Sequence, residues 1–210
     1  LYLTTNTNSI FLMSKAFSSF CLILLAFSTF AQKKPAAYEV KYDVYENEQK
    51  TAEQFSFSYD DGLVYLSKVD SRIQNYTDFK RKENNSTLTF ENKTYCKVTP
   101  FESLPKPTSD ERSKKILNYN CRYASFTYFS NKIEVWFTED AQAKGSPYNN
   151  YLPSEKALVL EISVNGSLRM KIHSIEKVKT YNVAKRHREL EVQVNDAEFE
   201  ELKINARYTR

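Results

Sequence analysis

Residues 38–44 read Tyr-Glu-Val-Lys-Tyr-Asp-Val, and their apolar and charged side chains alternate without exception. Alternation with a period of two is typical of a β-strand that buries one face. Residues 55–59 repeat the pattern, with aromatic side chains separated by serines. The Asp-Gly pair at 61–62 then predicts a tight hairpin turn, because glycine adopts a positive φ at low steric cost. The alternating strands and the turn that follows the second of them set the fold class as mostly β.

Strands of the same kind recur along the chain, and short turns join most of them. Further strands are expected at 63–66, 88–90, 95–98, 120–129, 133–138, 157–164 and 167–177, with hairpin turns at Ser130-Asn131-Lys132 and Asn165-Gly166. The pattern predicts an antiparallel meander of about nine or ten strands, curled into a bowl or barrel so that its edges are hidden. Residues 100–112 and 139–156 are expected to be loops, because prolines interrupt both.

The end of the chain has a different period. Asn195 with Glu198 three residues later predicts a capping box, and apolar residues then recur at helical spacing. We therefore expect a single β-rich domain over residues 32–194 and a short helical tail over 195–210. A downstream domain would follow that tail.

The first part of the chain has the features of a secretory leader. An apolar run over residues 16–30 follows Lys15 and ends at Ala31, before a polar stretch. The run is shorter than the roughly 20 apolar residues of a spanning helix, so a retained anchor is the less favoured alternative. Met13 is the expected start, and residues 1–12 are interpreted as read-through. Cleavage after about Ala31 would export the protein to the periplasm, outer envelope or medium and leave no stable membrane span.

The composition excludes several classes of function. The 210 residues include 30 Lys and Arg against 26 Asp and Glu, which gives a net charge of +4. So small a basic excess argues against a nucleic-acid partner, since binding to phosphates needs many cations. Three isolated glycines rule out a glycine-rich phosphate loop, and 14% aromatic residues rule out wholesale disorder. The oligomeric state is left open.

The two cysteines of the exported part are Cys96 and Cys121. In an oxidising compartment an even pair more often forms a disulfide than a metal site. The bridge would close a loop of about 25 residues and contribute on the order of 3 kcal/mol. Two unpaired buried thiols are the alternative.

The search for catalytic and metal-binding residues is mostly negative. Neither of the two histidines has a His, Cys or carboxylate at metal-ligand spacing, so we expect no metal and no cofactor. Glu139 and Asp140 open the long loop where function could lie, and His173 is the remaining candidate base. A small hydrolase that uses these carboxylates with His173 is kept as an alternative, although solvated surface positions are the favoured explanation of these side chains, because no partner lies at catalytic spacing.

Aromatic residues beside amides give the more suggestive pattern. Trp136 lies in a strand, and the long loop contains Tyr148, Asn149, Asn150 and Tyr151. Exposed rings can stack on the C–H faces of sugars while amides bind hydroxyls, so these five residues are the candidate binding site. The alternative is that Trp136 and part of the tyrosines belong to the core.

Two stretches of the sequence resemble a known family. Residues 113–124 read Ser-Lys-Lys-Ile-Leu-Asn-Tyr-Asn-Cys-Arg-Tyr-Ala, and residues 132–138 read Lys-Ile-Glu-Val-Trp-Phe-Thr. With Leu152-Pro153 and the strand at 157–162, they resemble the secreted Bacteroidetes proteins of the GLPGLI family. The chain departs from the naming motif, because Tyr151 precedes Leu-Pro where that family has glycine.

This departure, together with Lys144-Gly145-Ser146-Pro147 and Asn149-Asn150, is more similar to the N-terminal bowl-like domain of type II peptide N-glycosidase F. The resemblance covers about residues 37–180. It implies a non-catalytic β-rich module in front of a jelly-roll amidase that removes N-glycans, with a glycoprotein or glycan as the partner. No catalytic residue of that amidase can be placed on this chain. A stand-alone envelope protein, with or without a ligand, is the alternative.

Overall fold

The computed structural model describes residues 36–66, 72–128, 130–148, 150–179 and 188–208. Its contacts divide the chain into Leu1–Pro35 and Ala36–Arg210, and every described residue belongs to the second unit. The expected leader from Met13 to Ala31 lies outside the described residues. Within the described residues, no helix has the length and apolar character needed to cross a membrane.

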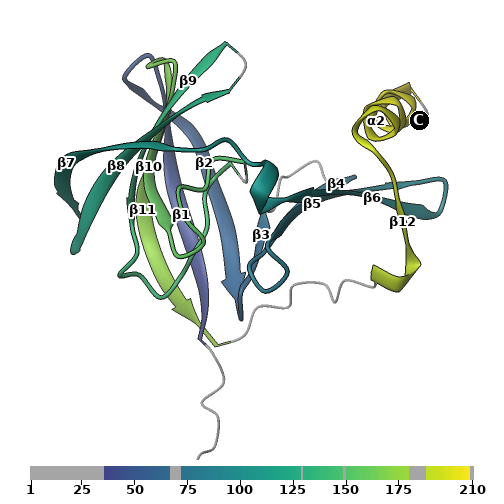
Figure 1. The fold of residues 1–210 in the computed structure, drawn as a ribbon, viewed down its shortest axis with the longest axis horizontal. Helices are drawn as coiled ribbons and strands as arrows, with labels where there is room; N and C mark the ends of the chain where they lie inside the picture. The colour runs from purple at the N-terminus through teal and green to yellow at the C-terminus, as the bar shows by residue number, and fades with distance from the viewer. Residues whose placement is uncertain (1–35, 67–71, 129, 149, 180–187, 209–210) are drawn as a thin grey trace, which may run out of the picture. The chain divides into compact units, whose positions relative to one another are not determined.

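The described unit is mostly β, as the sequence predicts, and its strands form one sheet (Figure 1). The sheet has 12 strands in the order β12-β6-β5-β4-β3-β2-β1-β11-β10-β9-β8-β7, so it is open and not a closed barrel. The strands are β1 (Ala37–Glu46), β2 (Gln49–Asp60), β3 (Leu63–Leu66), β4 (Ile73–Asp78), β5 (Glu83–Phe90), β6 (Lys93–Pro100), β7 (Thr108–Ile116), β8 (Tyr119–Tyr128), β9 (Asn131–Thr138), β10 (Leu158–Val164), β11 (Leu168–Val178) and β12 (Glu191–Gln193). Two 3₁₀ turns, η1 (Phe101–Ser103) and η2 (Arg188–Leu190), and the helix α2 (Asp196–Tyr208) complete it.

Two of the three predicted hairpin turns have the backbone that the sequence predicts, whereas Asn131 and Lys132 of the third already belong to β9. Asp61 and Gly62 have φ values of 46° and 85°, and Asn165 and Gly166 have 52° and 72°. Two successive positive φ angles define a type I′ turn, whose twist matches that of the flanking strands. The turns therefore fix the register of β2 with β3 and of β10 with β11.

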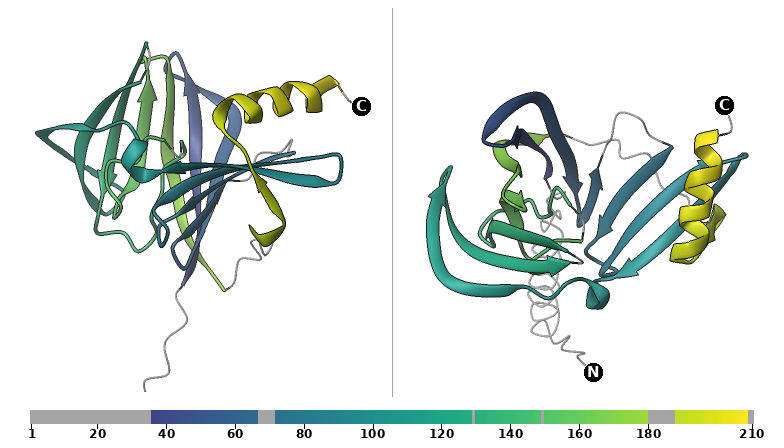
Figure 2. Two further views of the ribbon diagram at one scale, coloured as in Figure 1. Left: turned by 45° about the vertical axis from the view of Figure 1, so that its right-hand side comes forward. Right: turned by 90° about the horizontal axis from the view of Figure 1, so that it is seen from above.

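The main core lies between one face of the sheet and the loop over residues 139–157. Ile133, Val135 and Phe137 alternate onto this core face of β9 and are buried. The loop contributes the buried side chains Ala141, Ala143, Tyr151, Leu152 and Ala157. Figure 2 shows the strands from β7 to β2 curving around this loop. The long loop therefore fills the inside of the curved sheet.

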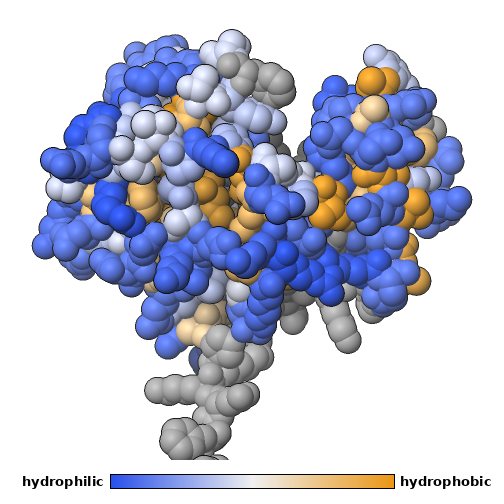
Figure 3. Space-filling view, in the orientation of Figure 1, coloured by the Kyte–Doolittle hydropathy of each residue, from blue (hydrophilic) through white to orange (hydrophobic). Residues whose placement is uncertain are grey.

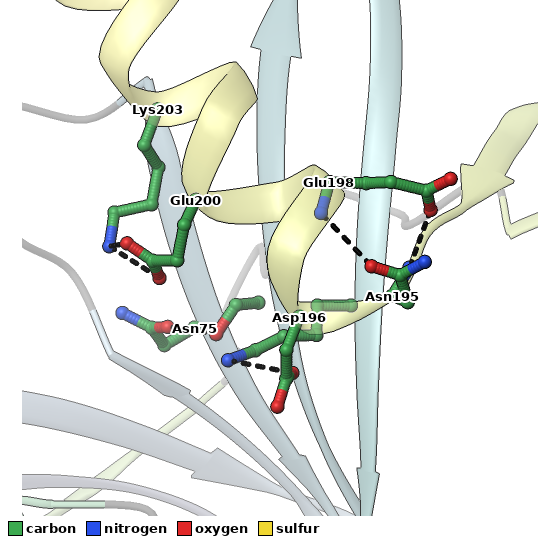
Figure 4. Close-up of polar contacts among 8 residues, drawn as sticks. Asn75, Asn195, Asp196, Glu198, Glu200 and Lys203 are labelled. Carbon is green, nitrogen blue, oxygen red and sulfur yellow. Dashed lines mark hydrogen bonds and ion pairs between the residues drawn. The ribbon is translucent and has the colours of Figure 1, made fainter.

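A second, smaller core lies under α2. Phe199 and Ala206 of α2 and Leu88 of β5 form this core. In Figure 3, hydrophobic residues gather beneath α2, where the helix covers the sheet. The predicted capping box is confirmed: Asn195 Oδ1 accepts from the Glu198 amide at 3.0 Å, and Glu198 Oε2 accepts from the Asn195 amide at 2.8 Å (Figure 4). The cap therefore fixes where the helix begins.

The predicted Cys96–Cys121 disulfide is wrong, since both residues are buried cysteines that are not bridged. Cys96 on β6 lies 3.7 Å from Asn85 Oδ1, whereas Cys121 on β8 belongs to the main core. The sheet order places β5, β4, β3, β2, β1, β11, β10 and β9 between their two strands. An oxidising compartment favours a disulfide only where two cysteines lie on neighbouring segments, and these two cysteines lie on distant strands.

Candidate functional site

The structure separates the five predicted binding residues. Trp136 is half-buried on the face of β9 opposite the core face, which we call the polar face. Tyr148, Asn150 and Tyr151 lie in the loop on the core side, and Asn149 is outside the described residues. The strand and the loop are therefore not one aromatic surface.

Tyr151 is a core residue. It is 8% exposed, and its ring lies 6.0 Å from the ring of Phe126 and 5.9 Å from that of Tyr148. Burial raises the pKa of both tyrosines above the ordinary value. Tyr148 and Asn150 are half-buried, and only their exposed parts are available to a ligand.

On the polar face, strand register brings Trp136 together with groups from neighbouring strands. Trp136 is paired with Tyr123 of β8 on one side and with Glu161 of β10 on the other. The Tyr123 and Trp136 rings meet edge to face at 5.4 Å. The Tyr123 hydroxyl donates to Glu134 Oε1 at 2.6 Å, and this bond, with Lys132, lowers the pKa of Glu134. The side chains are thus held in fixed positions.

Cations from the edge strand β7 cover both rings. The Arg112 guanidinium lies 3.4 Å from the centre of the Tyr123 ring, and Lys114 Nζ lies 4.3 Å from the centre of Trp136. Lys114 also pairs with Glu161 Oε2 at 2.6 Å. Arg112 covers a buried ring, because Tyr123 is 4% exposed, whereas Trp136 is half-buried. Lys114 is therefore the cation that a ligand would displace from Trp136; a cation over a ring is worth about 0.5–1 kcal/mol at an exposed site and more at a desolvated one. We call this group the Trp136 cluster: Arg112, Lys114, Tyr123, Glu134, Trp136 and Glu161.

Sequence reasoning missed the cationic part of this cluster because residues up to Arg112 were expected to be loop. β7 is polar throughout and lies at the edge of the sheet, so no apolar alternation marks it. The available signal was the spacing of Arg112 and Lys114, two residues apart, which places both side chains on one face of a strand.

The alternative hydrolase site is not assembled. Glu139 pairs with Arg122 at 2.9 Å and accepts from Ser154 Oγ at 2.6 Å. His173 Nδ1 lies 3.3 Å from Asp43 Oδ2, and Asp43 also pairs with Lys50 at 2.9 Å. These contacts, Lys50 first, lower the pKa of Asp43. Within the described residues, no hydrogen bond or ion pair joins Glu139 or Asp140 to His173.

Comparison with known proteins gives one family match. Residues 41–199 match the family described as "N-glycanase peptide, N-terminal domain". A comparison with curated proteins finds no match.

Two solved structures share the fold, and both are described as PNGF-II, in the C2 and P21 space groups. Their sequence identities to this chain are 20% and 19%, each with a TM-score of 0.67 over 80% of the chain. The match covers 32% and 33% of those structures, so this chain spans about a third of their length. At this identity the likeness concerns the fold.

Proposed function

The chain belongs to the N-glycanase N-terminal domain family, and from that membership we propose that it is a non-catalytic module that helps a peptide N-glycanase recognise its glycoprotein substrate. The match over residues 41–199 is the observation that carries the proposal, because it extends over most of the described unit. The glycan-releasing reaction is assigned to a different part of such an enzyme.

The chemistry of the Trp136 cluster supports recognition of a sugar. A half-buried indole gives a flat apolar surface for the C–H face of a sugar ring, and Tyr123 holds it in place. Glu134 and Glu161 can accept hydrogen bonds from sugar hydroxyls, while Arg112 and Lys114 can donate to them. Strands, not flexible loops, carry all six side chains.

The proposal includes export of the protein. N-glycosylated substrates occur outside the cytoplasm, and residues 13–31 have the charge and length of a cleaved leader.

Binding to an array of N-glycans and glycopeptides tests the function. We expect the chain to bind glycopeptides, and Trp136→Ala to weaken binding about tenfold, since stacking on an aromatic ring is worth roughly 1–1.5 kcal/mol. Tyr65→Ala is the matched control, because it removes a half-buried ring on β3, which stacks at 5.1 Å on Tyr76. Absence of binding to every glycan and glycopeptide would refute the recognition role. Equal losses of binding affinity in the two variants would show that Trp136 is not part of the binding site.

A further inference from the structure

A polar pocket lies on the other arm of the sheet, on the face of β5 and β6 away from α2. Asn85 is paired with Val98, and Thr87 with Cys96, so these side chains share the face opposite Leu88, which packs under α2. β12 runs beside β6, and the three strands enclose about 150 Å³. A water molecule occupies about 30 Å³ of liquid, so the pocket has room for several waters or one small ring.

The pocket has unused hydrogen-bonding groups. Asn85 is 1% exposed; its Nδ2 donates to Glu83 Oε1 at 3.3 Å, and its Oδ1 accepts from the Cys96 thiol at 3.7 Å. A carboxamide can make four hydrogen bonds, and a buried one is costly when they are unmade. Among the described residues these two long contacts are the ones that the Asn85 side chain makes. The side chains of Arg81 and Gln193 line the same pocket.

The charge around the pocket disfavours an anion. Arg188 lines the pocket and is held by Glu83 and, at 3.9 Å, by Asp78. Asp78 and Glu83 thus compensate the charge of Arg188, and Glu191 lines the pocket together with Arg81. Carboxamides and guanidinium groups together both donate and accept, which suits neutral hydroxyls.

We propose that this pocket binds one neutral hydroxylated ring, such as a single sugar residue, through Arg81, Asn85 and Gln193. The identification of that ring as part of a glycan rests on the proposed function, whereas the pocket itself does not. The site is separate from the Trp136 cluster, which is on β7 to β10.

The test is a titration of the 210-residue chain with mannose, N-acetylglucosamine and glucuronate, followed by NMR of the side-chain amides. We expect at least one neutral sugar to shift the signals of Asn85 and Gln193 with a Kd of about 1–10 mM. Glucuronate should bind more weakly. Gln193→Ala and Arg81→Ala should each weaken binding about fivefold, the value of one hydrogen bond. Gln49→Ala and Arg207→Ala are the matched controls, since both residues are exposed elsewhere.

Two results would overturn the proposal: no shift at Asn85 or Gln193 with either neutral sugar at about 50 mM, or tighter binding of glucuronate than of the neutral sugars. The outcome is independent of the glycopeptide array. Glycopeptide binding without binding of free sugar would leave the recognition role intact and remove this pocket. Sugar binding without glycopeptide binding would support the pocket and refute the recognition role.

Discussion

Gly145 lies where the loop over residues 139–157 comes closest to the core. Its amide donates to Ala157 O at 3.0 Å, and its carbonyl accepts from the Val159 amide at 2.9 Å. Its φ is +135°, and a Cβ there would lie 3.0 Å from both Phe57 Cζ and Val64 Cγ2. Both the backbone conformation and the space therefore require glycine.

We expect Gly145→Ala to lower the free energy of unfolding by about 3 kcal/mol or more, because strain and overpacking add. Gly166→Ala is the control, since Gly166 also has a positive φ of 72° but no atom lies within 4 Å of the place that an alanine methyl group would take. It should cost only about 1–2 kcal/mol. Urea unfolding measures the free energy of unfolding of both variants. Equal losses of stability would contradict the close packing of Gly145 against the core.

Tyr42 offers a second test at this scale. It is fully buried, and its hydroxyl donates to Val159 O at 2.6 Å. Burial raises the pKa of Tyr42 well above the ordinary value, so at high pH the unfolded chain loses this proton first. The contribution of Tyr42 to the free energy of unfolding is therefore complete below about pH 10 and falls as the pH rises further.

Tyr42→Phe should lose about 1–2 kcal/mol of unfolding free energy at pH 7, since a buried hydrogen bond is removed. The difference between the two proteins should then shrink by about 1.4 kcal/mol for each pH unit above 10. Other tyrosines with a raised pKa are present in both proteins, so their effects on stability cancel in this difference. A difference that stays constant between about pH 7 and pH 11 would contradict the burial of this hydroxyl.

Among the elements, α2 depends on its cap. The Asn195 side chain accepts from the Glu198 amide, and the helix is attached to the sheet through a small core around Phe199. Asn195→Ala should therefore lower the local stability of the first helical turn by about 1 kcal/mol. Hydrogen exchange of those amides should become about fivefold faster. Glu201→Ala, an exposed position on the same helix, should leave exchange unchanged, and similar rates in both variants would argue against the cap.

The sequence predicts elements well where one local pattern determines them. The Asp61-Gly62 and Asn165-Gly166 turns and the Asn195–Glu198 cap are all found, because each depends on a few adjacent residues. β7 was missed, since an edge strand pairs through its backbone and needs no apolar alternation. β4 and β12 were not predicted either, and the sheet of 12 strands has two more than the upper expectation of ten.

For the whole molecule, the sequence could not show which distant strands are neighbours. Pairing of Tyr123, Trp136 and Glu161 follows from register across three strands, and no local pattern encodes it. The same lack of long-range information led to the incorrect prediction of a disulfide between Cys96 and Cys121. Nor could the sequence show that Tyr151, a predicted binding residue, is buried, because the polar loop that carries it lies against the core.

Export is a prediction about the whole chain. If residues 13–31 are a leader, the protein recovered outside the cytoplasm should begin at about Gln32. Intact-mass measurement of that protein tests this. Recovery of a chain that retains the apolar run in the membrane fraction would instead indicate an anchor.

Recognition without catalysis is the central claim, and one column experiment tests both halves. The chain is immobilised, and a peptide with one N-linked glycan is passed over it together with the same peptide without the glycan. The account predicts that the glycopeptide is retained and later elutes with its mass unchanged, whereas the bare peptide is not retained. Elution of both peptides together would contradict recognition of the glycan, and recovery of the peptide with its glycan removed would contradict a non-catalytic module.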